Sequence, residues 1–320
     1  MKERWQSIVL ILIILISAEL THRNFEVATP VASSKTISAA PETSTPIPAP
    51  GNVSFKRASI LEVLGGAHRA PVRKWDVPDP TPSARGALLY SLDDDMTLWG
   101  MGVENARPTA SVIKLLTAVT VLENLGENKK VAVSETAIAA DGDAGELQSG
   151  EVYRSQDLLR VMLLTSSNDA ASVFAEAGGG EREFVRVMQG KALKIGMTGT
   201  HIDDPAGLSD LTTATPNDLL RLVRYILANH PQIFSWSRVP QFLVQPLNDP
   251  TSRTAQNINP LVNDARFLGG KTGTLESAGE NLVGVLSFHD KRLVAVILGS
   301  TDRVRDVNLI LDWAERAYEL

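Results

Sequence analysis

The chain has 320 residues, of which 43% are hydrophobic and 21% charged, and its net charge is −6. This composition is typical of a globular protein and allows one large domain or two small ones. The acidic balance and the lack of a basic stripe argue against nucleic-acid binding. The absence of cysteine excludes disulfides, a thiol nucleophile and thiolate metal sites. The five histidines have no paired spacing, so we predict neither a metal nor a cofactor.

An apolar run, Ile8–Ile16, follows the basic residues Lys2 and Arg4 near the N-terminus. The run is shorter than the roughly 20 residues that a membrane span requires. We therefore predict that residues 1–25 are a signal peptide or a short signal anchor, and both cleavage and retention stay open. Either case predicts export to the cell envelope, at the outer face of the cytoplasmic membrane, in the periplasm or outside the cell. Membrane attachment would require the segment to remain uncleaved.

Residues 26–52 are rich in Pro, Ser, Thr and Ala and contain few large apolar side chains. Such a segment cannot bury enough apolar surface to fold. Residues 53–80 end in a proline-rich stretch, Pro78–Pro82, that interrupts regular structure. We predict a mostly disordered tether over residues 26–80 and a folded domain over residues 81–320. Whether residues 53–80 pack on that domain is left open.

The folded region begins with a predicted hairpin, residues 87–92 and 96–101, around the turn Asp93-Asp94-Asp95. Pro108 and Thr109 predict the start of a helix that ends near Gly126, with Thr109 as its cap. Further helices are predicted at 155–164, 168–177, 181–195, 217–228 and 304–318, and further strands at 267–274, 281–288 and 292–298. This order predicts an α/β (α+β) fold in which helices flank an antiparallel sheet and a helical subdomain is inserted.

The helix after Thr109 carries a hydroxyl and an amine, Ser111 and Lys114, among apolar residues. Residues three apart share a helix face, so the two side chains can touch. A lysine beside a serine in a dry pocket can activate the hydroxyl as a nucleophile. The simpler alternative is a capping serine and a lysine that extends to solvent.

Two further short motifs follow along the chain. Ser166-Ser167-Asn168 could be merely a helix cap, and Lys271-Thr272-Gly273 merely a lysine at a strand edge. Together with Ser111-x-x-Lys114, however, they form in order the motif set of penicillin-binding proteins and active-site serine β-lactamases. The combination favours the catalytic interpretation of all three.

On these motifs the sequence resembles the D-alanyl-D-alanine carboxypeptidases, the low-molecular-mass penicillin-binding proteins, over roughly residues 80–318. The resemblance extends to residues around the motifs and to a later loop: Arg107–Ala110, Asn168–Ala171, Asp204–Leu208, Gly270–Thr274 and Ala278–Val283. It implies the β-lactamase/transpeptidase-like fold. It also implies a serine peptidase that removes the terminal D-Ala from peptidoglycan stem peptides, needs no metal and binds β-lactam inhibitors.

The resemblance further implies a role for each polar residue of the first two motifs. Ser111 would attack the carbonyl of the penultimate D-Ala. Lys114 would accept the serine proton, with a pKa lowered by burial and by nearby Lys271. Ser166 would relay the proton to the leaving amine. Asn168 would bind the substrate amide and hold Lys114.

The third motif is implied to bind substrate. Lys271 would supply positive charge for the terminal carboxylate, and Thr272 and Thr274 would donate hydrogen bonds to it. Gly273 would let the peptide pair along the strand edge. The backbone N–H groups of Ser111 and Thr274 would form the oxyanion hole.

Three departures from the family pattern are present. Ser167 stands where many members have Gly, and Thr274 replaces the His of some members. Only 49 residues follow Lys271 (320 minus 271). The additional C-terminal β-domain and amphipathic anchor of many members are therefore expected to be absent.

Three other functions were weighed. A DD-endopeptidase that cuts peptidoglycan cross-links would use the same site. A β-lactamase usually needs a deacylating glutamate in a Glu-x-x-Leu-Asn segment, and the corresponding loop, residues 203–207, contains none. A non-enzymatic wall-binding module is disfavoured because every catalytic position is filled.

Overall fold

The computed structural model describes residues 71–139 and 144–319, which all fall within one compact unit, residues 64–320. The predicted signal segment, residues 1–25, and residues 26–70 of the predicted tether lie outside the described residues. Within the described part, no helix has both the length and the apolar character needed to cross a membrane.

A five-stranded antiparallel sheet forms the centre of the unit, with the strand order β10-β11-β12-β2-β3. The strands are β2 (Gly86–Ser91), β3 (Met96–Met101), β10 (Phe267–Leu275), β11 (Gly279–Phe288) and β12 (Lys291–Ser300). The predicted hairpin is present as β2–β3, and the strands predicted at 281–288 and 292–298 pair as the hairpin β11–β12. The pairing of Val296 with Leu88 joins these late strands to the early hairpin. The sheet prediction is therefore confirmed, and β10 is an edge strand.

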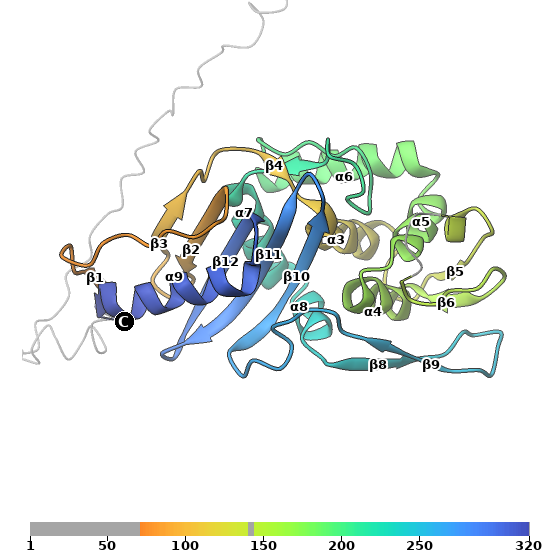
Figure 1. The fold of residues 1–320 in the computed structure, drawn as a ribbon. Coiled ribbons are helices and arrows are strands. Elements are labelled where there is room, and N and C mark those ends of the chain that lie inside the picture. Colours follow the sequence, from red (N-terminus) through yellow and green to blue (C-terminus); the bar gives the residue numbers. More distant parts are fainter. Residues whose placement is uncertain (1–70, 140–143, 320) are drawn as a thin grey trace, which may run out of the picture. The chain divides into compact units, whose positions relative to one another are not determined.

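Alternate residues of the strands face two separate hydrophobic layers. One face packs against α9 (Arg303–Ala317), which crosses the sheet in Figure 1, through Leu89 and Ile297 against Ile310 and Trp313. The opposite face, through Leu88 and its neighbours, contacts the main helical core. This alternation follows from the period of two along a strand.

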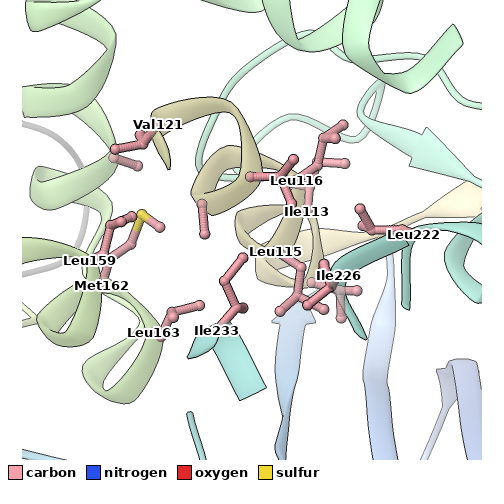
Figure 2. Close-up of a cluster of buried hydrophobic side chains, with 14 of the residues drawn as sticks. Ile113, Leu115, Leu116, Val121, Leu159, Met162, Leu163, Leu222, Ile226 and Ile233 are labelled. Carbon is pink, nitrogen blue, oxygen red and sulfur yellow. The ribbon is translucent and has the colours of Figure 1, made fainter. Parts of the chain in front are cut away.

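Six helices build the second layer and the inserted subdomain. They are α3 (Lys114–Asn124), α4 (Ser155–Thr165), α5 (Asn168–Ala177), α6 (Glu181–Ile195), α7 (Pro216–Asn229) and α8 (Gln232–Ser237). Figure 2 shows Leu115 of α3 among side chains from α4, α7 and α8, such as Leu163, Ile226 and Ile233. Because α3 is surrounded in this way, the turn that carries Ser111 is fixed to both the sheet and the helical subdomain.

The start of the Ser111 helix differs from the prediction. Arg107–Pro108 form a short strand, β4, that pairs with β7 (Thr213–Ala214), and a 3₁₀ turn, η1 (Ala110–Ile113), precedes α3. Thr109 does not cap the helix. Its hydroxyl instead donates to the carbonyl of Thr212, 3.2 Å away. The cross-strand pairing of Pro108 thus prevailed over its local tendency to begin a helix.

Residues 71–80 pack on the domain, so the boundary predicted at residue 81 is too late. Strand β1 (Val72–Arg73) pairs with β13 (Tyr318–Glu319) at the end of α9. The indole N–H of Trp313 donates to the carbonyl of Pro78 at 2.9 Å. These contacts join the first described segment to the last.

Apart from α8 and the short strands already described, five small elements lie outside the predicted set. They are the strand pair β5 (Lys130–Ala132) and β6 (Val152–Arg154), the 3₁₀ turn η2 (Ala137–Ala139), and the strand pair β8 (Gln241–Val244) and β9 (Arg253–Gln256). The β8–β9 hairpin extends away from the sheet below α4 in Figure 1. Its strands are four residues long, too short to give a distinct periodic pattern.

Candidate active site

Ser111 lies in η1 with its hydroxyl oxygen 2.8 Å from Nζ of Lys114. Lys114 is fully buried at the first position of α3. Its amine also donates to Oδ1 of Asn168 and to the carbonyl of Ala206, each at 2.7 Å. One amine therefore joins the first motif, the second motif and the loop after α6.

Burial lowers the pKa of Lys114 to about 7, and the negative charge of Asp204 opposes part of that shift. A neutral amine donates two hydrogen bonds and accepts one. With Asn168 and Ala206 as acceptors, the remaining lone pair is directed to the hydroxyl of Ser111. The arrangement can therefore take a proton from Ser111 near neutral pH.

The carbonyl of Ala206 is held by a loop that Asp204 organises. The carboxylate of Asp204 accepts from four successive backbone N–H groups, those of Ala206 to Ser209, at 2.6–3.0 Å, and from the Thr212 hydroxyl at 3.0 Å. The resemblance to the family covers this loop but implies no role for Ala206 or Asp204. A backbone carbonyl carries no side-chain signal, which is why the Lys114 contact was missed.

In the second motif, one residue caps a helix and the other two contact the buried lysines. Ser167 caps α5, since its hydroxyl accepts from the N–H of Ala170 at 3.1 Å. Ser166 ends α4 in the left-handed conformation, with φ +64°. Its hydroxyl accepts from Nζ of Lys271 at 2.9 Å. The capping interpretation thus applies to Ser167 only. Ser166 contacts Lys271, and Asn168 contacts Lys114.

The third motif lies on the edge strand β10, directly beside the Ser111 turn. Lys271 is buried, and its amine also donates to the carbonyl of Thr272 at 2.8 Å. A Cβ atom added to Gly273 would lie 2.8 Å from the backbone nitrogen of Ser111. Only glycine allows this approach, which brings the free edge of β10 against the first turn of the nucleophile's helix.

Both lysines of the site have lowered pKa values. Burial lowers the pKa of Lys271 well below its usual value, and the positive charges of Lys114 and Arg303 lower it further. For Lys114 too, burial is the largest cause of the lowered pKa. Because repulsion between two ammonium groups is mutual, the expectation that Lys271 also lowers the pKa of Lys114 stays a prediction beside the effect of burial.

Arg303, at the start of α9, was missed by sequence analysis. Its guanidinium donates to the carbonyls of Gly273 and Asn281, each at 3.0 Å, and to the hydroxyl of Thr274. It also pairs with Glu280 at 3.0 Å. With Thr272 and Thr274 it lines a cavity of about 540 Å³. Its position 32 residues after Lys271 gave no local motif that could reveal it.

The geometry above gathers all eight predicted site residues, Ser111, Lys114, Ser166, Asn168, Lys271, Thr272, Gly273 and Thr274, around the free edge of β10. Among the described residues, no group of three or more His, Asp or Glu side chains is arranged to hold a metal ion.

Two curated relatives share this region. A D-alanyl-D-alanine carboxypeptidase of Mycobacterium tuberculosis is 29% identical over 225 residues, which cover 69% of this chain and 77% of the relative. A D-alanyl-D-alanine endopeptidase of Pseudomonas aeruginosa is 30% identical over 244 residues, which cover 73% of this chain and 75% of the relative.

Two solved structures share the fold. A D-alanyl-D-alanine carboxypeptidase from Mycobacterium tuberculosis superposes with a TM-score of 0.70 at 28% identity, over 76% of this chain and 95% of that one. A penicillin-binding protein from Listeria monocytogenes in its cefotaxime-bound form gives a TM-score of 0.65 at 23% identity, over 74% and 99%. The family model for D-alanyl-D-alanine carboxypeptidases, which are serine hydrolases, matches residues 76–302. This chain therefore belongs to the D-alanyl-D-alanine carboxypeptidase family, as its three motifs predicted.

Proposed function

We propose that Ser111 is the nucleophile of a carboxypeptidase that removes the terminal D-Ala from peptidoglycan stem peptides. The observation that carries the proposal is the 2.8 Å contact of Ser111 with a buried lysine whose pKa is lowered to about 7. The neutral amine of Lys114 takes the Ser111 proton while Oγ bonds to the carbonyl carbon of the penultimate D-Ala. The N–H groups of Ser111 and Thr274 stabilise the oxyanion, a contribution of about 3 kcal/mol for each donor.

Collapse of this intermediate breaks the carbon–nitrogen bond and requires a proton for the leaving amine. Ser166 supplies it and is reprotonated by Lys114, which in this way passes on the proton that it took from Ser111, while the hydrogen bond with Lys271 holds the Ser166 hydroxyl in place. Asn168 holds Lys114 and binds the substrate amide. Water then attacks the acyl-enzyme, releases the shortened peptide and restores the Ser111 hydroxyl.

The terminal carboxylate of the substrate binds between Thr272, Thr274 and Arg303. The guanidinium of Arg303 adds a permanent positive charge at this place, which its ion pair with Glu280 balances in part. Arg303 thus joins Lys271 in the role that the sequence suggested for Lys271 alone. The amine of Lys271 also contacts Ser166.

Hydrolysis of cross-links is the second candidate, since some relatives are named endopeptidases. The test is D-alanine release from a muropeptide pentapeptide, with a cross-linked dimer run in parallel. Release from the pentapeptide supports the carboxypeptidase, and cleavage of the dimer alone supports the endopeptidase. Failure of both substrates would reject the proposed function.

β-Lactams should acylate the same serine, as the cefotaxime-bound neighbour suggests for this fold. A fluorescent penicillin is expected to label the wild type and not Ser111→Ala. Rapid β-lactam hydrolysis is not expected. The only carboxylate in residues 203–207 that lies beside Lys114 belongs to Asp204, and its two oxygens are occupied by five hydrogen bonds.

We further propose that the protein is exported and works at the cell envelope, with the segment before residue 26 as signal peptide or anchor. The proposal rests on the apolar run Ile8–Ile16 and on the extracytoplasmic location of peptidoglycan. Fractionation of cells that produce the full chain, with N-terminal sequencing, would test export and cleavage together. An uncleaved chain in the cytoplasm would contradict it.

A further inference from the structure

Ile258 is a large apolar side chain that stays 57% exposed at the edge of the candidate active site. It lines the 540 Å³ cavity that also contains Thr272, Thr274 and Arg303. It also lines a second cavity, of about 230 Å³, beside Thr165. Ile258 thus stands at the boundary between two cavities, one of which adjoins the second motif and the other the third.

The loop that carries Ile258 is held in place on both sides. The N–H of Ile258 donates to the carbonyl of Leu164 at 3.0 Å, two residues before Ser166. The side chain of Asn257 donates to the carbonyls of Ser237 and Val239 at 2.8–2.9 Å. The exposed side chain is therefore presented by a fixed backbone, which reduces the entropy lost when a ligand packs against it.

The second cavity lies between the end of α4 and strand β9. Its walls are formed mainly by Gly145, Glu146, Thr165, Arg253, Thr254 and Ile258. Arg253 is paired with the buried carboxylate of Glu151, so its charge is balanced within the protein. Thr254 is exposed on β9. The cavity therefore offers space and polar groups without an unbalanced cation.

The proposed function fixes which side of the substrate reaches this region. The group that leaves carries the carboxylate, which binds Thr272, Thr274 and Arg303 in the larger cavity. The rest of the leaving group must then lie near Ile258. A single D-Ala ends there, whereas a larger leaving group continues past Ile258 into the second cavity.

We propose that Ile258 and the cavity beside Thr165 form a leaving-group subsite that accepts the neighbouring stem peptide of a cross-link. The inference rests on the proposed function, because it takes the position of the carboxylate from it. It assigns to Ile258 the role of a specificity residue on the leaving side of the scissile bond. One chain would then serve both as carboxypeptidase and as endopeptidase.

The test compares kcat/KM for the pentapeptide and the cross-linked dimer. Thr254→Trp fills the second cavity from an exposed position. We expect it to lower kcat/KM for the dimer about tenfold or more, and for the pentapeptide by no more than about twofold, as for a group excluded from a pocket. Gln256→Trp, on the same strand and cavity wall, is a second filling variant. Penicillin labelling of Ser111 verifies that each variant is folded.

Ile258→Ala should raise KM for the dimer about three- to tenfold with little change in kcat, and Ile258→Val should restore most of the loss. Leu193→Ala, at an equally exposed leucine on α6, is the matched control and should change kcat/KM for neither substrate. The proposed subsite would be overturned if both filling variants left the ratio of kcat/KM for the dimer to kcat/KM for the pentapeptide unchanged. A wild type that releases D-Ala but never cleaves the dimer would also overturn it, and the proposed function would survive both results.

Discussion

Gly207 presses against the backbone of Ala110, the residue before the nucleophile. A Cβ atom added to Gly207 would lie 2.0 Å from the carbonyl oxygen of Ala110. Both residues have positive φ, +77° for Gly207 and +46° for Ala110. The neighbouring carbonyl of Ala206 accepts from Lys114, so this contact determines the position of the nucleophile and of the base together.

Gly207→Ala should therefore displace the loop and reduce both stability and acylation. The left-handed φ alone costs about 1–2 kcal/mol for a residue with a side chain. Gly150→Ala is a matched control, because Gly150 has φ +87° and no atom within 4 Å of an added Cβ. We expect both variants to lose stability in thermal unfolding and only Gly207→Ala to lose penicillin acylation. Equal acylation rates in the two variants would contradict the coupling.

Acylation of Ser111 should increase as pH rises through about 7, because the neutral form of Lys114 is the base. Between that pH and the ordinary lysine pKa of 10.5, the unfolded chain binds a proton at Lys114 that the folded chain does not. The stability cost of burying Lys114 is therefore complete below pH 7 and disappears as pH approaches about 10. Stopped-flow penicillin acylation measures the first effect and denaturant unfolding at several pH values the second. Lys114→Met should abolish acylation and flatten that part of the stability profile.

Asp204→Asn should move the same acylation profile toward lower pH. The negative charge of Asp204 raises the pKa of Lys114, so its removal lowers that pKa further. The variant also replaces an acceptor with a donor opposite backbone N–H groups, so it should lower stability by about 1–3 kcal/mol. A midpoint that stays at the wild-type pH would show that Asp204 acts only through the loop.

Arg303→Gln tests which cation binds the substrate carboxylate. We expect KM for a D-Ala-D-Ala peptide to rise about tenfold, the size of one lost charged hydrogen bond. The corresponding C-terminal amide lacks the charge and should respond much less. Arg305→Gln, an exposed neighbour on α9, is the control. An equal response of acid and amide to Arg303→Gln would instead assign the charge to Lys271.

Features with a local signal in the sequence could be predicted, whereas contacts between distant parts of the chain could not. The strands, the main helices and the three motifs were predictable because each carries a periodic or short-range signal. Arg303 and the carbonyl of Ala206 were not, since their importance arises only when α9 and the 204–208 loop fold against β10 and α3. Thr109 failed as a cap for the same reason, because its hydroxyl bonds to Thr212, 103 positions away.

The segment of residues 71–80 should contribute to stability without affecting catalysis. It pairs with β13 and receives the Trp313 hydrogen bond on the α9 face of the sheet, whereas Val112 and Ile113, which follow Ser111, belong to the opposite layer. Trp313→Phe keeps an aromatic ring and loses the bond to Pro78, which should cost about 1 kcal/mol, and the cavity left by the smaller ring in this buried position should add to that cost. A chain that begins at residue 81 should unfold at a clearly lower temperature than one that begins at residue 71. Penicillin acylation of the folded proteins should be the same in all of these variants. If a chain that begins at residue 81 unfolded at the same temperature as one that begins at residue 71, the contacts of Val72 and Trp313 would be structurally neutral and the domain would begin where the sequence suggested.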